Sequence, residues 1–143
     1  MNRRKSRELS MKLIYQMSVN KEDYKDVIEN LKESIECDLK SDEDIDLKDI
    51  DMEFIIRILK GVENNKEVID REIEKYLVNW KLSRLSKIDL TILRICTFEI
   101  MFEEDIPDNV SINEALELAK KYSDDKSAAF INGVIDKIIK NKM

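Results

Sequence analysis

The scarcity of residues that break helices constrains this chain most: its 143 residues include two glycines and one proline. Sheets built from many short strands need frequent tight turns, and those turns depend on glycine and proline. Hydrophobic residues make up 43% of the chain and charged residues 39%, a mixture typical of helices with one apolar and one charged face. We therefore expect an all-α fold. A single compact domain over residues 1–143 fits this length, which suffices for a buried core without disulfides or metals.

The first half of the chain shows apolar residues at helical spacing. Residues 3–18 predict a first helix, and a second amphipathic helix begins near Tyr24 and ends near Ile35. The pattern from Ile50 to Tyr76 fits one long helix, or two in series with a kink at Asn64-Asn65. Gly61 lies inside this pattern and indicates a place where another helix packs close.

Residues 36–53 carry nine acidic side chains and two lysines. This composition favours a solvated loop that runs into the start of a helix, where acidic groups suit the positive end of the helix dipole. An acidic docking segment is the alternative interpretation.

The segment from Ile88 to Phe102 is apolar on nearly all sides, which predicts a central, buried helix. Arg94 interrupts it and needs a partner if it is buried. Glu99 is five residues further on, a poor spacing within one helix, so either side chain could pair across helices. Cys96 fits the same core as a small apolar residue.

Two further helices follow Pro107. Ser111 to Glu114 matches an S-x-x-E capping box that would open the first of them. The second would be capped by a residue within 123–125, with Ile131, Val134, Ile135 and Ile138 as its buried face. Gly133 in this last helix costs about 1 kcal/mol relative to alanine, which again suggests a close helix crossing.

Positive charge is concentrated at the N-terminus although the whole chain has a net charge of −6. Residues 1–12 contain five cations and one acid, a net charge of +4, which leaves −10 for the other 131 residues. A basic tip on an acidic body favours a local anion site and repels nonspecific nucleic acid. A solvated, frayed terminus is the alternative.

Several classes of function are disfavoured by what the sequence lacks. It has no histidine and no glycine-rich phosphate loop, so most acid-base, nucleophilic and nucleotide-dependent mechanisms have no candidate residues, and we expect no enzymatic activity and no cofactor. Cys37 and Cys96 follow no metal-ligand spacing and suit reduced thiols in the cytoplasm. The N-terminus lacks the apolar region of a signal peptide, and no window is apolar enough to span a membrane.

Three motifs in the second half resemble the NusB family: LSKIDLTILRICTFEI, IPDNVSINEALELAKKYS and AAFINGVIDKI. The arginine-rich start, RRKSRELSMKLIYQ, is similar to the same family. The resemblance implies about seven helices arranged as two small bundles, an N-terminal one over about 1–80 and a C-terminal one over about 81–143. It also implies transcription antitermination, notably on ribosomal RNA operons.

The resemblance further implies the partners of this protein. They are boxA-like single-stranded RNA, the small-subunit ribosomal protein NusE, and an RNA polymerase elongation complex with other Nus factors. On the RNA side the matching positions are Arg3, Arg4, Lys5, Arg7, Tyr15, Lys126 and Phe130. Cations hold phosphates, and aromatic faces stack on unpaired bases. Core packing is the alternative role for Tyr15 and Phe130.

On the protein side the resemblance implies contacts by Tyr76, Ser83 and Asp89. Two positions depart from the family pattern. Ser83 stands where the family often has an acid, and Lys126 stands where the family can carry an acid near the RNA. A helical protein–protein module without direct RNA binding remains the second hypothesis for function, and an enzyme that uses a pair of carboxylates is the third.

Overall fold

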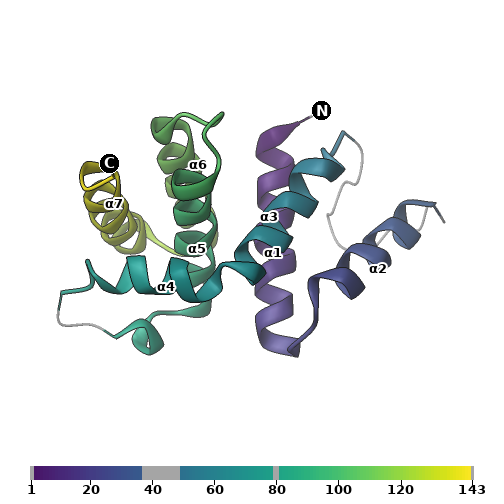
Figure 1. Cartoon of the computed structure of the whole chain (residues 1–143), viewed down its shortest axis with the longest axis horizontal. Coiled ribbons are helices and arrows are strands. Elements are labelled where there is room, and N and C mark those ends of the chain that lie inside the picture. The colour runs from purple at the N-terminus through teal and green to yellow at the C-terminus, as the bar shows by residue number, and fades with distance from the viewer. Residues whose placement is uncertain (1, 37–48, 79–80, 143) are drawn as a thin grey trace. The chain divides into compact units, whose positions relative to one another are not determined.

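The computed structural model describes residues 2–36, 49–78 and 81–142. Within these ranges it contains seven α-helices, one short 3-10 turn and no strand, which confirms the all-α prediction (Figure 1). In chain order the elements are α1 (Arg3–Asn20), α2 (Tyr24–Glu36), α3 (Met52–Asn64), α4 (Lys66–Glu74), η1 (Leu82–Arg84), α5 (Lys87–Phe102), α6 (Asp108–Tyr122) and α7 (Asp125–Lys140).

The chain divides into two compact units, residues 1–60 and residues 61–143. The division therefore comes after Lys60, whereas the sequence suggested a boundary near residue 80. The difference arises from α4, which packs against α5 and α7 and buries Ile69 and Ile73 completely. Hydrophobic burial assigns this helix to the second unit.

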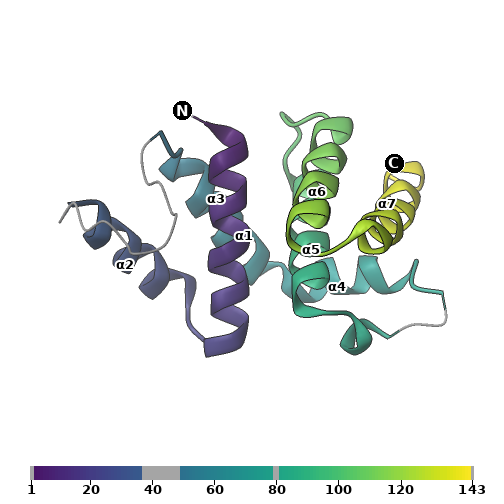
Figure 2. The ribbon, with the colours of Figure 1, turned by 180° about the vertical axis from the view of Figure 1, so that it is seen from behind.

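The first unit contains α1, α2 and most of α3. Its core comes from one face of each helix, as the apolar spacing predicted. The fully or nearly fully buried apolar side chains are Leu9, Met11, Ile14, Met17, Val27, Ile28, Leu31, Phe54, Ile55, Ile58 and Leu59. In the view from behind, α1 faces the reader with α3 beyond it (Figure 2). Helix α1 is followed by the C-cap residue Lys21, whose left-handed backbone lets the N–H of Glu22 reach the Met17 carbonyl at 3.1 Å.

The second unit is built around α5. This helix packs against α4, α6 and α7, and every residue from Thr91 to Ile100 is buried. The apolar face predicted for the last helix, Ile131, Val134, Ile135 and Ile138, is buried on α7. Cys96 is buried in this core. This burial confirms the central helix that the sequence predicted.

Several local predictions are confirmed. Helix α3 ends at Asn64 and α4 starts at Lys66, which places the interruption at Asn64-Asn65. Asp124 is the N-cap of α7, and its side chain accepts the N–H of Ser127 at 2.7 Å. Cys37 and most of the acidic segment 36–53 lie outside the described residues, so the interpretations of that segment stay predictions.

The capping box at Ser111 is wrong. Helix α6 already begins at Asp108 after the N-cap Pro107, so Ser111 lies within the helix and is buried. Its hydroxyl donates to Glu99 Oε1 of α5 at 3.1 Å. The serine satisfies a buried carboxylate on another helix instead of capping its own, because an unpaired charge there would be costly.

The two glycines, which carried the same prediction, differ in their surroundings. A Cβ atom built at Gly61 would clash with the Phe98 ring, so the predicted close approach of helices is confirmed there. A Cβ built at Gly133 meets no atom of the described chain within 4 Å, so the predicted close crossing at α7 is wrong. The cost of that glycine therefore has no explanation in the packing of the described residues.

None of the helices in the described ranges combines the length and the apolar character that crossing a membrane would need.

Candidate nucleic-acid interface

Hydrogen bonds fix the first turn of α1 to the segment that precedes α3. The N–H of Asn2 donates to the Asp49 carbonyl at 2.6 Å, and the N–H of Asp51 donates to Ser6 Oγ at 2.7 Å. The buried Ser6 hydroxyl in turn donates to the Asn2 carbonyl at 2.8 Å. Asn2 also caps α1, since its Oδ1 accepts the N–H of Lys5 at 3.0 Å. The basic tip therefore starts from an ordered backbone, which argues against a frayed terminus.

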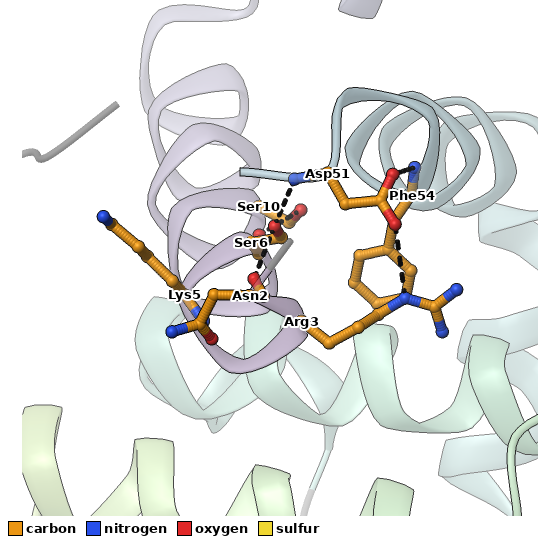
Figure 3. Close-up of polar contacts among 7 residues, drawn as sticks. All are labelled: Asn2, Arg3, Lys5, Ser6, Ser10, Asp51 and Phe54. Carbon is orange, nitrogen blue, oxygen red and sulfur yellow. Dashed lines mark hydrogen bonds and ion pairs between the residues drawn. The ribbon is translucent and has the colours of Figure 1, made fainter. Parts of the chain in front are cut away.

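Arg3 lies between a carboxylate and an aromatic ring (Figure 3). Its Nε donates to Asp51 Oδ2 at 3.4 Å, and its guanidinium carbon is 4.6 Å from the centre of the Phe54 ring. The other oxygen of Asp51 accepts the N–H of Phe54 at 3.2 Å, which caps the start of α3. Half of the Arg3 side chain stays exposed. Because an exposed ion pair contributes at most about 1 kcal/mol, a phosphate can compete with Asp51 for this cation.

Arg7 differs from the other cations of the tip. Its side chain is buried, with 4% of the residue exposed, and its guanidinium carbon lies 5.1 Å from the centre of the same Phe54 ring. A cation over an aromatic face is attracted by roughly 0.5–2 kcal/mol, more when water is excluded. This placement supports a role in joining α1 to α3, and the direct phosphate contact suggested by the resemblance stays a prediction.

The remaining residues predicted on this helix face outward. Arg4 is exposed and Lys5 is half-buried, and Lys5 extends away from Asp51 and Phe54 (Figure 3). Tyr15 is 38% exposed, eleven residues after Arg4 and so on the same side of α1. Core packing, the alternative for Tyr15, does not fit this exposure. Helix α1 therefore presents Arg4 and the ring of Tyr15 on one exposed side.

The second unit carries the other two predicted RNA residues, both on α7. Lys126 is exposed and Phe130 is half-buried. They are four residues apart and therefore lie on one face of the helix. The interface predicted from the sequence thus has two parts, one on α1 and one on α7.

The predicted protein-binding residues all lie in the second unit. Tyr76 is half-buried just after α4, and its N–H donates to the Ile73 carbonyl at 3.1 Å. Beside it, the carboxylate of Glu72 accepts a hydrogen bond from Lys75 at 2.9 Å and raises the pKa of that lysine. Ser83 is exposed in η1. These positions leave Tyr76 and Ser83 accessible to a partner.

Asp89 is the third predicted contact, and it is 91% buried, since 9% of the residue is exposed. Its Oδ2 accepts the hydroxyl of Ser127 at 2.9 Å, and that hydroxyl oxygen accepts the hydroxyl of Ser123 at 2.8 Å. Its Oδ1 is buried and has no hydrogen-bond partner in the described parts of the chain. Asp89 thus joins the first turn of α5 to the first turn of α7. Direct contact of its carboxylate with a protein partner stays a prediction.

A hollow beside η1 contains Ser83. It is lined by Glu74, Lys81, Leu82, Ser83, Leu90 and Arg94. Arg94 is held there by two hydrogen bonds to Asp70, from Nε to Oδ1 at 2.8 Å and from Nη2 to Oδ2 at 2.9 Å. The predicted need of Arg94 for a partner across helices is confirmed. The hollow offers charged groups of both signs, a combination that suits polar contacts with a protein.

Sequence reasoning missed three residues that build these sites: Asp51, Phe54 and Asp70. Asp51 had a usable signal, because an aspartate three residues before the first buried residue of a helix is typical of an N-cap. Phe54 was assigned to the core, and the core does contain it, but its ring also holds two guanidinium groups. Asp70 had no distinguishing signal among the acidic residues of α4.

This chain is similar to known proteins over nearly its whole length. The family model described as NusB family matches residues 4–140. A transcription antitermination protein NusB of Clostridium botulinum (strain Kyoto / Type A2) is 58% identical, with 97% of this chain and 100% of that protein covered.

Solved structures share the fold. NusB of T. maritima matches with a TM-score of 0.82 at 34% identity, covering 99% of this chain and 92% of that one. A crystal structure of antitermination factors NusB and NusE in complex with double-stranded RNA matches with a TM-score of 0.76, covering 96% of each chain. Its identity is 24%, so this match supports the fold alone.

Proposed function

The chain belongs to the NusB family, and we propose from this membership that it is a transcription antitermination factor. It binds boxA-type single-stranded RNA together with ribosomal protein NusE, and it joins an RNA polymerase elongation complex with other Nus factors, notably on ribosomal RNA operons. The role is one of binding, without catalysis, and its place is the cytoplasm.

The anchored basic tip of α1 is the observation that carries this proposal. Asn2, Ser6 and Asp51 order the helix start before any ligand arrives, and Arg3 is already held against Phe54. A cation that is ordered in advance loses less conformational entropy on binding. Arg4 and Lys5 add positive charge on the exposed side of the same turn. Phosphates of an unpaired strand fit this arrangement, because the attraction is local and the rest of the chain is acidic.

The aromatic residues supply the second part of the proposal. Tyr15 on α1 and Phe130 on α7 are each accessible at least in part. Stacking of an unpaired base on such a ring contributes about 1–3 kcal/mol and tolerates different bases. Phosphate contacts and stacking together favour a single strand, whose bases can reach the rings.

The protein partner binds the second unit in this proposal. Tyr76, Ser83 and the hollow beside η1 provide an accessible ring and charged groups of both signs. We expect the free protein to bind RNA weakly, because four to five cations offer few phosphate contacts, and we expect NusE to complete the site.

Fluorescence anisotropy with a labelled boxA-like single strand tests this function, with and without NusE. NusE should lower the Kd for RNA, and an unchanged Kd would refute the joint complex. Phe130→Ala should weaken RNA binding at a nearly unchanged salt dependence, because stacking releases few counterions. A melting curve must show that this variant folds.

A second experiment distinguishes the residues that bind NusE from those that bind RNA. Tyr76→Ala should weaken binding to NusE measured without RNA, whereas Arg4→Ala should leave that binding unchanged. If wild-type protein binds NusE but no RNA under any condition, the helical protein–protein module is the correct description.

A further inference from the structure

Gly133 occupies a position where the described structure does not require a glycine. It lies inside α7, is exposed, and has no positive φ angle that would require glycine. A Cβ at this position would meet no atom within 4 Å in the described ranges. Glycine in a helix interior is less favourable than alanine, and one established use of it is to let a ligand approach the backbone closely.

The neighbours of Gly133 along α7 show what could approach. Lys126, Phe130, Gly133 and Lys137 follow one another at spacings of four, three and four residues. Such positions lie above one another on one face of a helix. Lys126 and Lys137 are exposed, and Phe130 is half-buried between them. This face, which we call the α7 track, therefore has a cation at each end and a ring beside bare backbone in the middle.

The adjacent face of α7 has a different chemistry. Asp125, Ala129, Asn132 and Asp136 each precede a residue of the α7 track by one position. One residue corresponds to about 100° around a helix, so they form a parallel row beside the track. That row has acids at both ends. The cations are thus gathered on one side of the exposed surface and the acids on the other.

The two lysines of the α7 track are available to bind an anion. Among the described residues, Lys126 and Lys137 form no ion pair. The acid nearest to Lys137 in sequence, Asp136, is paired with Lys140 at 2.9 Å. An anion that reaches the track would therefore not have to displace an internal partner of either lysine.

We propose that the α7 track binds a single strand of RNA, with Gly133 as the point of closest approach and Lys137 as an additional phosphate contact. The proposal rests on the proposed RNA-binding function and deepens it by extending the interface two turns beyond Phe130. Cations spaced along a helix hold successive phosphates, and a base stacked on Phe130 brings the strand against the bare backbone at Gly133. A side chain at position 133 would push the strand away.

Gly133→Gln and Gly133→Ala test the close approach. Both should raise the melting temperature, by about 2–4 °C for a single replacement of this kind, because the fold has space for the new side chain. Gly133→Gln should nevertheless weaken RNA binding in the presence of NusE by at least about fivefold, the effect of a steric cost near 1 kcal/mol. A protein that gains stability while losing affinity cannot have lost binding through unfolding.

Asn132→Gln is the matched control, since it places the same side chain at an exposed position of α7 that is about 100° around the helix from Gly133. It should leave the RNA Kd unchanged. Lys137→Gln should reduce the slope of log K against log salt by about 0.7, the amount for one phosphate contact on a single strand. Lys25→Gln removes the same charge from an exposed position of α2 that belongs to neither predicted interface, and it should leave the slope unchanged.

The outcomes separate this inference from the proposed function. If wild-type protein with NusE does not bind the boxA-like strand, the proposed function itself fails. If wild type binds and Gly133→Gln binds equally well, the track is refuted while the function stands. If Gly133→Gln instead weakens binding to NusE measured without RNA, the face contacts protein and the RNA track is also refuted.

Discussion

Replacing Arg94 with alanine should destabilise the protein strongly. The guanidinium donates two hydrogen bonds to Asp70, at 2.8 and 2.9 Å, and the side chains of Arg94 and Asp70 are only 11% and 18% exposed. Removing one member of a buried pair leaves the other charge without compensation, at a cost of about 3–5 kcal/mol. For a chain of this size each kcal/mol lowers the melting temperature by roughly 2–4 °C. We therefore expect a decrease of about 6–20 °C.

Thermal unfolding followed by circular dichroism measures this decrease, and urea unfolding gives the free energy directly. Asp70→Ala should cost a similar amount, and the double variant Arg94→Ala with Asp70→Ala should cost less than the sum, because no charge is then left alone. Lys75→Ala is a suitable control, since it removes an exposed pair with Glu72 and should leave the melting temperature nearly unchanged. A melting temperature of Arg94→Ala equal to that of wild type would refute the argument.

Three further changes have expected outcomes. Thr97→Val should leave the free energy of unfolding in urea unchanged or raise it by about 1 kcal/mol. The hydroxyl of Thr97 is fully buried and has no hydrogen-bond partner in the described residues, so its replacement by a methyl group removes the cost of burying it. Gly61→Ala should lower the melting temperature, because its Cβ would meet the buried Phe98 ring, and overpacking costs about 1–3 kcal/mol; a rise would show that the ring moves freely. The double variant Arg4→Ala with Lys5→Ala should weaken RNA binding and flatten the salt dependence by up to about 0.7 per phosphate contact, and an unchanged slope would exclude the tip as a phosphate site.

The helices were predictable because the apolar periodicity is produced by the same burial that forms the core. Leu9, Ile14 and Met17 on α1 and the buried face of α7 illustrate this agreement. The roles of single polar side chains were harder to predict from the sequence. Ser111 carries a capping signature, but three residues before it Asp108 already begins α6, and the buried Glu99 takes the serine hydroxyl. A short motif cannot reveal that a distant carboxylate competes for the same side chain.

Parts of the candidate site depended on contacts between residues far apart in the sequence. The basic tip was visible as a charge cluster, but its division into the buried Arg7 and the exposed Arg4 required the position of Phe54. The partner of Arg94 required the packing of α4 on α5. Gly61 and Gly133 gave identical signals, and only the neighbouring ring of Phe98 distinguished them. Spacing identifies which residues share a face, and packing decides what that face meets.

The hydroxyl chain from Ser123 through Ser127 to Asp89 has a consequence for genetics. Because this chain fixes the start of the helix that carries Phe130, a substitution at Asp89 should be pleiotropic, altering RNA binding as well as any protein contact. A screen for partner-defective alleles would therefore recover Asp89 mutants that are not specific for the partner. Suppressors of such alleles are expected at Ser127, the residue that donates to the lost carboxylate. Their recovery there would show that the Asp89 substitution had disrupted the contact between α5 and α7 and not the surface that binds the protein partner.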